Sequence, residues 1–226
     1  MSIPSYSLNR RLVAEGVGTA FLLMAVVGGG IAAQRLSPED VGLQLLEAAV
    51  VTAFALMILI WSLGPISGAH FNPCVTLLDM VMGNRSPAEG TAYVGAQIAG
   101  GIAGTVLANL MFELDPIEWS DTARGGSGQL LAEVIATLGL MMVIFMIARP
   151  GGLGLGYVAP AVGVYIGGGY FFTSSTSFAN PAVTISRMFS DTFAGIAPAS
   201  APAFIVMQLV GAGLALVLVR FLLGPE

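Results

Sequence analysis

Two asparagine–proline pairs, one in each half of the chain, could act together on a solute. Each pair is followed by a small residue, and the six residues are Asn72, Pro73, Cys74, Asn180, Pro181 and Ala182. Asparagine is a favoured helix N-cap, and proline suits the first helical position because it has no N–H to lose. Each pair therefore predicts a helix start. Helix N-termini carry partial positive charge and amides donate hydrogen bonds, so we expect this centre to repel cations and to accept neutral hydroxyl groups.

Two acidic residues, Glu15 and Glu133, stand inside long apolar runs. A carboxylate at membrane depth is costly unless it has partners. One interpretation is that each accepts hydrogen bonds from backbone N–H groups that lack helical partners, and so supports an irregular segment. The other is solute binding or proton relay. We favour the supporting role.

His70 and Cys74 are the one histidine and the one cysteine, four residues apart. A thiolate near a helix N-terminus can be a nucleophile, so a covalent centre is one interpretation. The favoured one is that Cys74 is a small packing residue close to a pore, which predicts inhibition by mercurials. A single cysteine and a single histidine are too few for a zinc site, and no cofactor-binding or catalytic constellation appears, so neither a metal, a cofactor nor an enzyme is expected.

The elements that position these residues are membrane helices. The chain has 226 residues, 56% hydrophobic and only 9% charged, which is typical of a membrane protein. Acidic residues outnumber basic ones for a net charge of −5, which excludes a nucleic-acid partner. Six apolar stretches are long enough to cross a bilayer, namely 11–33, 42–64, 90–112, 129–148, 154–173 and 202–223. We expect an all-α membrane protein with a single domain over residues 1–226.

The arginines predict the orientation in the membrane. With six spans, both termini and the second and fourth connections share one side, and that side carries Arg10, Arg11, Arg85, Arg149 and Arg220. The opposite side carries Arg35, Arg124 and Arg187. Because basic residues stay on the cytoplasmic side, we expect a multi-pass protein of the cell membrane with cytoplasmic termini.

The chain repeats itself. Each half holds an acidic first span, a second span, an Asn-Pro segment and a third span with a glutamine, Gln97 or Gln208. Three spans are an odd number, so the second half, about 127–224, lies upside down relative to the first, about 8–115. The Asn-Pro segments then enter from opposite faces and meet near the midplane.

The residues ahead of each Asn-Pro pair cannot form a spanning helix. Irregular backbone at membrane depth is tolerated where it lines a water-filled cavity. The expected lining residues are Gly68, Ala69, His70, Ser175 and Thr176. Together with the two facing helix starts, they predict a pore for neutral solutes.

These features identify a resemblance to the aquaporin, or major intrinsic protein, family along essentially the whole chain. The residues that carry it are the two Asn-Pro-Ala-type boxes, the Ser-Gly-Ala-His-Phe sequence before the first box, and the paired glutamates. The resemblance implies an aquaporin-like fold of six spanning helices and two re-entrant half-helices. It also implies one pore per subunit and a homotetramer in the lipid bilayer.

The resemblance also points to an outer selectivity filter with an unusual composition. The matching positions are Thr52, Gly168, Ser177 and Val183. Val183 stands where the family has an arginine, and every member is small, so we expect a wide, aquaglyceroporin-like constriction. Water, glycerol, urea and undissociated metalloid acids such as arsenous acid are the expected solutes.

Arg187 lies one helical turn beyond Val183 on nearly the same face. It could replace part of the missing filter charge. Equally, it could pair with Asp191 or face the water outside the half-helix.

A passive channel is the favoured function, and two other classes remain open. A secondary transporter would share the inverted repeat but needs a titratable group in the path, for which Glu15, Asp79 and Glu133 are the candidates. A non-conducting membrane scaffold would need none.

Overall fold

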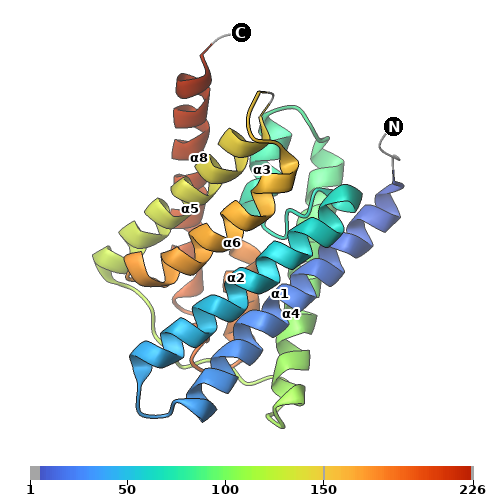
Figure 1. The fold of residues 1–226 in the computed structure, drawn as a ribbon. Coiled ribbons are helices and arrows are strands. Elements are labelled where there is room, and N and C mark those ends of the chain that lie inside the picture. The colour runs from blue at the N-terminus through green and yellow to red at the C-terminus, as the bar shows by residue number, and fades with distance from the viewer. Residues whose placement is uncertain (1–5, 150, 225–226) are drawn as a thin grey trace.

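The computed structural model describes residues 6–149 and 151–224, which form helices and loops without a strand in those ranges (Figure 1). Six helices are long and three are short. In chain order they are α1 (Leu8–Leu36), α2 (Val41–Ser67), α3 (Pro73–Val81), α4 (Pro87–Met111), α5 (Gly126–Ala148), α6 (Leu155–Phe172), α7 (Pro181–Ser186), η1 (Arg187–Phe189) and α8 (Ala201–Leu223).

The six long helices fall on the six predicted apolar stretches, most of them extended by a few residues at one end or both. Among the described residues, α1, α2, α4, α5 and α8 are long and apolar enough to cross a membrane. The sixth, α6, has 18 residues and is about 27 Å long at 1.5 Å per residue. Helix starts follow local chemistry, since Asp40 caps α2 and Ser86 caps α4 through their side-chain oxygens.

The two halves pack alike. In the first half α1 lies against α4, and in the second half α5 lies against α8, while α2 and α6 join the halves. The α1–α4 crossing depends on two glycines, because a Cβ on Gly100 would lie 2.0 Å from the carbonyl oxygen of Gly16, and one on Gly104 would lie 2.2 Å from that of Ala20. Side chains at these positions would force the helices apart.

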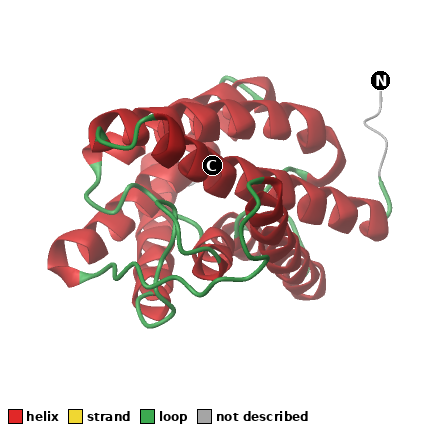
Figure 2. Cartoon of the chain, turned by 90° about the horizontal axis from the view of Figure 1, so that it is seen from below, coloured by secondary structure: helices red, strands yellow, loops and turns green. Residues whose placement is uncertain are grey.

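The short helices α3 and α7 lie inside this frame, and each packs against both α4 and α8. They meet through their N-terminal ends, as the repeat predicts. Figure 2 shows the molecule turned by 90° and seen from below, with loops joining the helices. For the site we call the end with Arg85 the inner end and the end with Arg187 the outer end. Helix α1 begins and α8 ends toward the inner end (Figure 1).

Candidate functional site

The two asparagines cap their half-helices. The Oδ1 atom of Asn72 accepts from the Cys74 N–H at 2.9 Å, and that of Asn180 accepts from the Ala182 N–H at 2.9 Å. Pro73 and Pro181 occupy the first helical positions, as predicted. The N-terminal ends of α3 and α7 therefore keep their helical geometry up to the point where they meet.

The side-chain amides cross between the halves. Asn72 Nδ2 donates to the carbonyl of Ala179, and Asn180 Nδ2 donates to the carbonyl of Phe71, both at 2.8 Å. Each amide carries two N–H bonds, so one remains after this contact. Both asparagines line the main cavity, and the remaining donors are available to an oxygen inside it.

The segments ahead of the two asparagines, which we call the arms, adopt unusual backbone conformations at matching places. Ala69 and Phe71 before Asn72 have φ of 48° and 47°, and Ser177 and Ala179 before Asn180 have φ of 54° and 48°. Left-handed φ in residues other than glycine costs on the order of 1 kcal/mol each, so contacts elsewhere must hold the arms.

The buried carboxylate of Glu15 holds the first arm. It accepts from the backbone N–H of His70 at 2.9 Å and of Phe71 at 2.8 Å, and from the hydroxyl of Ser67 at 2.6 Å. The amide of Gln97 completes the set at 2.8 Å. Since a carboxylate satisfies donors that no helix pairs, Glu15 stabilises the strained arm.

Glu133 does the same in the second half. It accepts from the N–H of Phe178 at 3.0 Å, of Ala179 at 2.9 Å, and from the Gln208 amide at 2.6 Å. Both glutamates are fully buried, and neither lines the cavity. This arrangement agrees with the supporting role and places neither glutamate on the cavity wall.

The main cavity has a volume of about 570 Å³ and reaches from the inner to the outer end. Apolar side chains from α1, α5 and α6 form part of its wall, and both asparagines line it as well. Of the residues predicted to form the site, the lining includes Thr52, Gly68, Ala69, His70, Asn72, Ser177, Asn180, Val183 and Arg187.

Gly168 does not line the cavity, contrary to the filter prediction. It lies on the exposed side of α6, and a Cβ there would meet only the Phe172 ring, at 3.9 Å. Tyr170 lines the cavity instead. The sequence contained a signal for this position of Tyr170. The residues of α6 that line the cavity stand four positions apart, which places them on one face of a helix: Val158, Val162, Ile166 and Tyr170.

Two residues of the second arm also lie elsewhere than predicted. The Ser175 side chain is buried and accepts from the Ser177 N–H, and Thr176 is half-buried outside the cavity lining. Phe178 lines the cavity instead, next to Ser177, which was predicted to line it. The arm turns at Thr176 and Ser177, whose φ values are positive. Counting residues back from Asn180 therefore does not predict which side chains of the arm face the cavity.

Cys74 is completely buried in the hydrophobic core and does not line the cavity. His70 does line it, and its Nδ1 lies 3.0 Å from the Thr76 hydroxyl. No contact joins the thiol to the imidazole among the described hydrogen bonds. Cys74 thus occupies a packing position, as favoured above, but its side chain does not line the cavity, and the structure lends no support to the nucleophilic interpretation.

Arg187 is only 4% exposed and lines the cavity. Its Nε donates to the carbonyl of Ala194, and its guanidinium carbon lies 3.5 Å from the centre of the Phe178 ring. Asp191, the predicted alternative partner, instead accepts from Ser120 and Asp121. Arg187 thus faces the path rather than the surrounding water.

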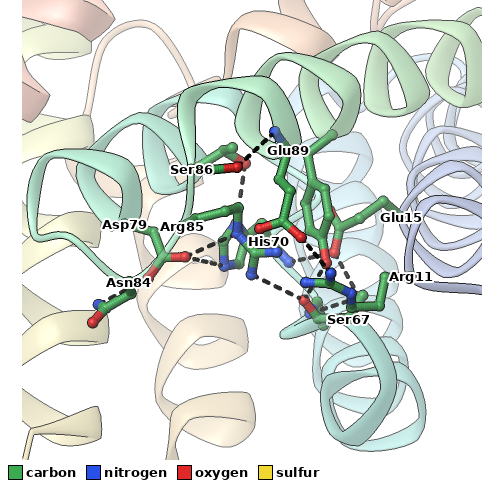
Figure 3. A network of polar contacts seen from close by, with 12 residues as sticks. Arg11, Glu15, Ser67, His70, Asp79, Asn84, Arg85, Ser86 and Glu89 are labelled. Atoms are coloured by element: carbon green, nitrogen blue, oxygen red, sulfur yellow. Dashed lines mark hydrogen bonds and ion pairs between the residues drawn. The ribbon is translucent and has the colours of Figure 1, made fainter. Parts of the chain in front are cut away.

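Figure 3 shows a charged cluster at the inner end, and three of its residues, His70, Asp79 and Arg85, line the cavity. Arg85 Nε lies 3.0 Å from Asp79 Oδ2, and His70 Nε2 lies 3.6 Å from the same oxygen. The Arg85 guanidinium also stacks on the ring of Tyr93, 4.0 Å from its centre. Because Arg85 balances Asp79, the carboxylate that had been a candidate ion-binding group is already paired.

Comparisons with known proteins found relatives along most of the chain. The sequence model of the family described as Major intrinsic protein matches residues 2–177. The chain is 46% identical over 220 residues to an aquaglyceroporin named AqpS from Rhizobium meliloti (strain 1021), covering 97% of this chain and 93% of that protein.

More distant relatives include the aquaporin NIP1-3 of Oryza sativa subsp. japonica, 33% identical over 64% of this chain and about half of that protein. Among solved structures, the X-ray structure of the aquaglyceroporin from Plasmodium falciparum superposes with a TM-score of 0.76 at 20% identity, covering 96% of this chain and 97% of that one. This structural likeness concerns the fold.

Proposed function

This chain belongs to the major intrinsic protein family and forms a passive channel, and we propose that it conducts water together with glycerol-sized neutral solutes. The observation that carries the proposal is the cavity itself, which runs past two facing half-helix N-termini with one amide N–H of each asparagine left to serve a solute. Both helix ends place partial positive charge at the centre, so cations are repelled while neutral hydroxyl compounds pass.

The chemistry of the outer wall supports solutes larger than water. We propose Thr52, Ser177 and Val183 as members of the outer constriction. Val183 presents an apolar surface to the path, which suits the carbon side of a polyol, and the hydroxyls of Thr52 and Ser177 suit its oxygens. Glycerol, urea and undissociated metalloid acids such as arsenous acid share this small, neutral and oxygen-rich character.

A secondary transporter is less well supported. Glu15 and Glu133 are saturated by backbone and amide donors away from the cavity, and Asp79 is the one carboxylate among the described lining residues. Since Asp79 is paired with Arg85, the path offers no free acidic group to couple a gradient. A non-conducting scaffold would not require a cavity lined by the two capping asparagines.

The test is flux into liposomes. Purified protein in vesicles is mixed with sucrose and then with glycerol in a stopped-flow instrument, and vesicle size is followed by light scattering. We expect fast shrinkage in both solutes and fast re-swelling in glycerol alone, unchanged when proton and sodium gradients are collapsed. Flux no faster than in empty vesicles would contradict the channel, and shrinkage without re-swelling would restrict it to water.

We also propose the assembly and placement that the family suggests. The protein would be a homotetramer in the lipid bilayer of the cell membrane, with one pore per subunit and both termini in the cytoplasm. The outward faces of α1, α2 and α6 support this, since exposed apolar side chains such as Phe21, Phe54 and Val164 suit either lipid or a neighbouring subunit.

A further inference from the structure

We propose that Tyr170 and Arg187 complete the outer constriction and determine its specificity, although neither occupies a position that spacing from the Asn-Pro pairs assigns to it. The inference rests on the channel proposed above. It assigns to Tyr170 the place in the constriction that spacing gives to Gly168. It assigns to Arg187 the positive charge that the family resemblance leads one to expect at position 183.

Tyr170 lines the cavity from α6 and reaches the neighbouring helix α2. It is 6% exposed, and its hydroxyl lies 2.9 Å from the Thr52 hydroxyl, a contact between helices of opposite halves. The second arm comes close at the same level, since a Cβ on Gly169 would lie 2.7 Å from the Ser177 side chain. Tyr170, Thr52 and Ser177 therefore border one section of the cavity, and an aromatic ring narrows a section that small residues alone would leave wide.

The hydroxyl groups in this section have unused capacity. Within the Thr52–Tyr170 pair one hydroxyl donates to the other, so one O–H and several lone pairs remain. The Ser177 hydroxyl is buried and has no partner in the part of the chain that the structure describes. A buried hydroxyl without a partner is costly, and a passing solute oxygen would satisfy it.

Arg187 brings a cation into the same cavity. Only its Nε is engaged, by Ala194, and its plane rests on Phe178. None of the ion pairs found in residues 6–149 and 151–224 includes it. Because its terminal amino groups have no hydrogen bond within those ranges and are not enclosed by protein, they are free to donate to a solute.

Arg187 and Tyr170 have different roles in the constriction. The positive charge of Arg187 adds to the helix ends in excluding cations, and its N–H groups hold a hydroxyl or carbonyl oxygen. Tyr170 sets the width and offers a hydroxyl pair that either donates or accepts. The solute class that fits is neutral, compact and bears several oxygens, as glycerol and urea do.

Variants at Tyr170 test whether its ring sets the width of the constriction and whether its hydroxyl binds the solute. In proteoliposomes, Tyr170→Ala should let sorbitol, a six-carbon polyol, re-swell the vesicles, which the parent protein should not. Tyr170→Phe keeps the ring, so sorbitol should stay excluded, while the glycerol-to-water permeability ratio should fall about fivefold for the loss of one hydrogen bond.

Gly168→Ala is the matched control for α6. Its added methyl group meets only ordinary contact with Phe172, so sorbitol exclusion and the glycerol-to-water ratio should stay as in the parent protein. A shift in Gly168→Ala with none in the Tyr170 variants would overturn the assignment of Tyr170 and restore the one drawn from spacing.

Variants at Arg187 test the charge. Proton flux into vesicles with a pH-sensitive dye inside should rise about tenfold or more in Arg187→Gln, with water flux retained, and should return close to the parent value in Arg187→Lys because the charge is restored. Arg35→Gln is the control, since it removes an exposed arginine outside the cavity lining. A structural role would lower water flux in both Arg187 variants instead.

Equal proton flux in Arg187→Gln and the parent protein would overturn the assignment of Arg187. The same vesicles separate this inference from the channel itself. Parent protein that conducts water and glycerol, with variants that match it, refutes only the inference. Parent protein that conducts neither refutes both.

Discussion

At the scale of single residues, the composition of the outer constriction is set by the side chains that reach the cavity. Alignment of a position with a motif does not by itself bring its side chain there. Val183 reaches it and Gly168 does not. The difference arises because Val183 belongs to a half-helix whose start Asn180 fixes, whereas the rotation of α6 depends on its packing against α2 and α5.

Val183→Arg should lower glycerol flux about tenfold while sparing water. The longer side chain would occupy the wall near Arg187 and add a second charge, leaving room for water but not for a three-carbon polyol. Stopped-flow re-swelling in glycerol, set against shrinkage in sucrose, measures both rates. Val183→Leu serves as a control for bulk without charge, and equal glycerol flux in Val183→Arg and the parent would count against the place of Val183 in the constriction.

Cys74 should react slowly with mercurials, because its side chain is buried in the core. Water flux should therefore be inhibited only weakly during a brief exposure to mercuric chloride. Cys74→Ser, which removes the one cysteine, should show the same flux with and without the reagent. Rapid and complete inhibition that Cys74→Ser abolishes would instead place the thiol within reach of the pore.

At the scale of elements, the two arms are held by the same device in each half. A buried glutamate accepts the arm's backbone N–H groups, and a glutamine bridges that glutamate to a threonine of the half-helix, Thr76 in α3 and Thr184 in α7. The arms thus depend on contacts with α1 and α5, which lie far from them in sequence.

Glu15→Gln should reduce the amount of folded protein several-fold more than it alters selectivity. The amide offers one acceptor oxygen in place of two, so buried donors lose partners at about 1–3 kcal/mol each. Fluorescence-detected size exclusion measures the yield, and the glycerol-to-water ratio per molecule of protein measures selectivity. Glu133→Gln should reduce the yield in the same way. Glu39→Gln, at an exposed site, should change neither the yield nor the glycerol-to-water ratio. Normal yield with gradient-dependent flux lost would favour the transporter.

At the scale of the whole molecule, the inverted repeat makes the channel nearly symmetric at its centre and unlike at its ends. The Asn72–Ala179 and Asn180–Phe71 contacts mirror each other. The inner end carries the Asp79–Arg85 pair, and the outer end carries Arg187 without a carboxylate partner among the described ion pairs. Of the charged residues that line the cavity, Arg187 lies at the outer end, whereas the Asp79–Arg85 pair lies at the inner end together with Arg149.

The orientation in the membrane can be tested with single cysteines on a Cys74→Ser background. Asp115→Cys lies in the exposed connection between α4 and α5, and Ala88→Cys lies in the exposed first turn of α4 at the other end. A membrane-impermeant maleimide should label Asp115→Cys in intact cells and Ala88→Cys only after permeabilisation, because basic residues favour the cytoplasm. The reverse pattern would invert the predicted topology.

The sequence by itself determined that this is a helical membrane protein built from an inverted repeat. Apolar stretches of sufficient length, two Asn-Pro helix starts and the matched Glu15 and Glu133 are local signals, and local signals are enough to place helices and their caps. The meeting of α3 and α7 near the centre of the bundle followed from the odd number of spans in each half.

Only the tertiary structure decided which side chains face the path. Tyr170 rather than Gly168 lines the cavity because packing sets the rotation of α6, and Ser175 turns away because the arm passes through left-handed conformations. Arg187 stacks on Phe178 instead of pairing with nearby Asp191 because the loop after α7 folds back over it. These outcomes depend on contacts between distant residues, which no local pattern encodes.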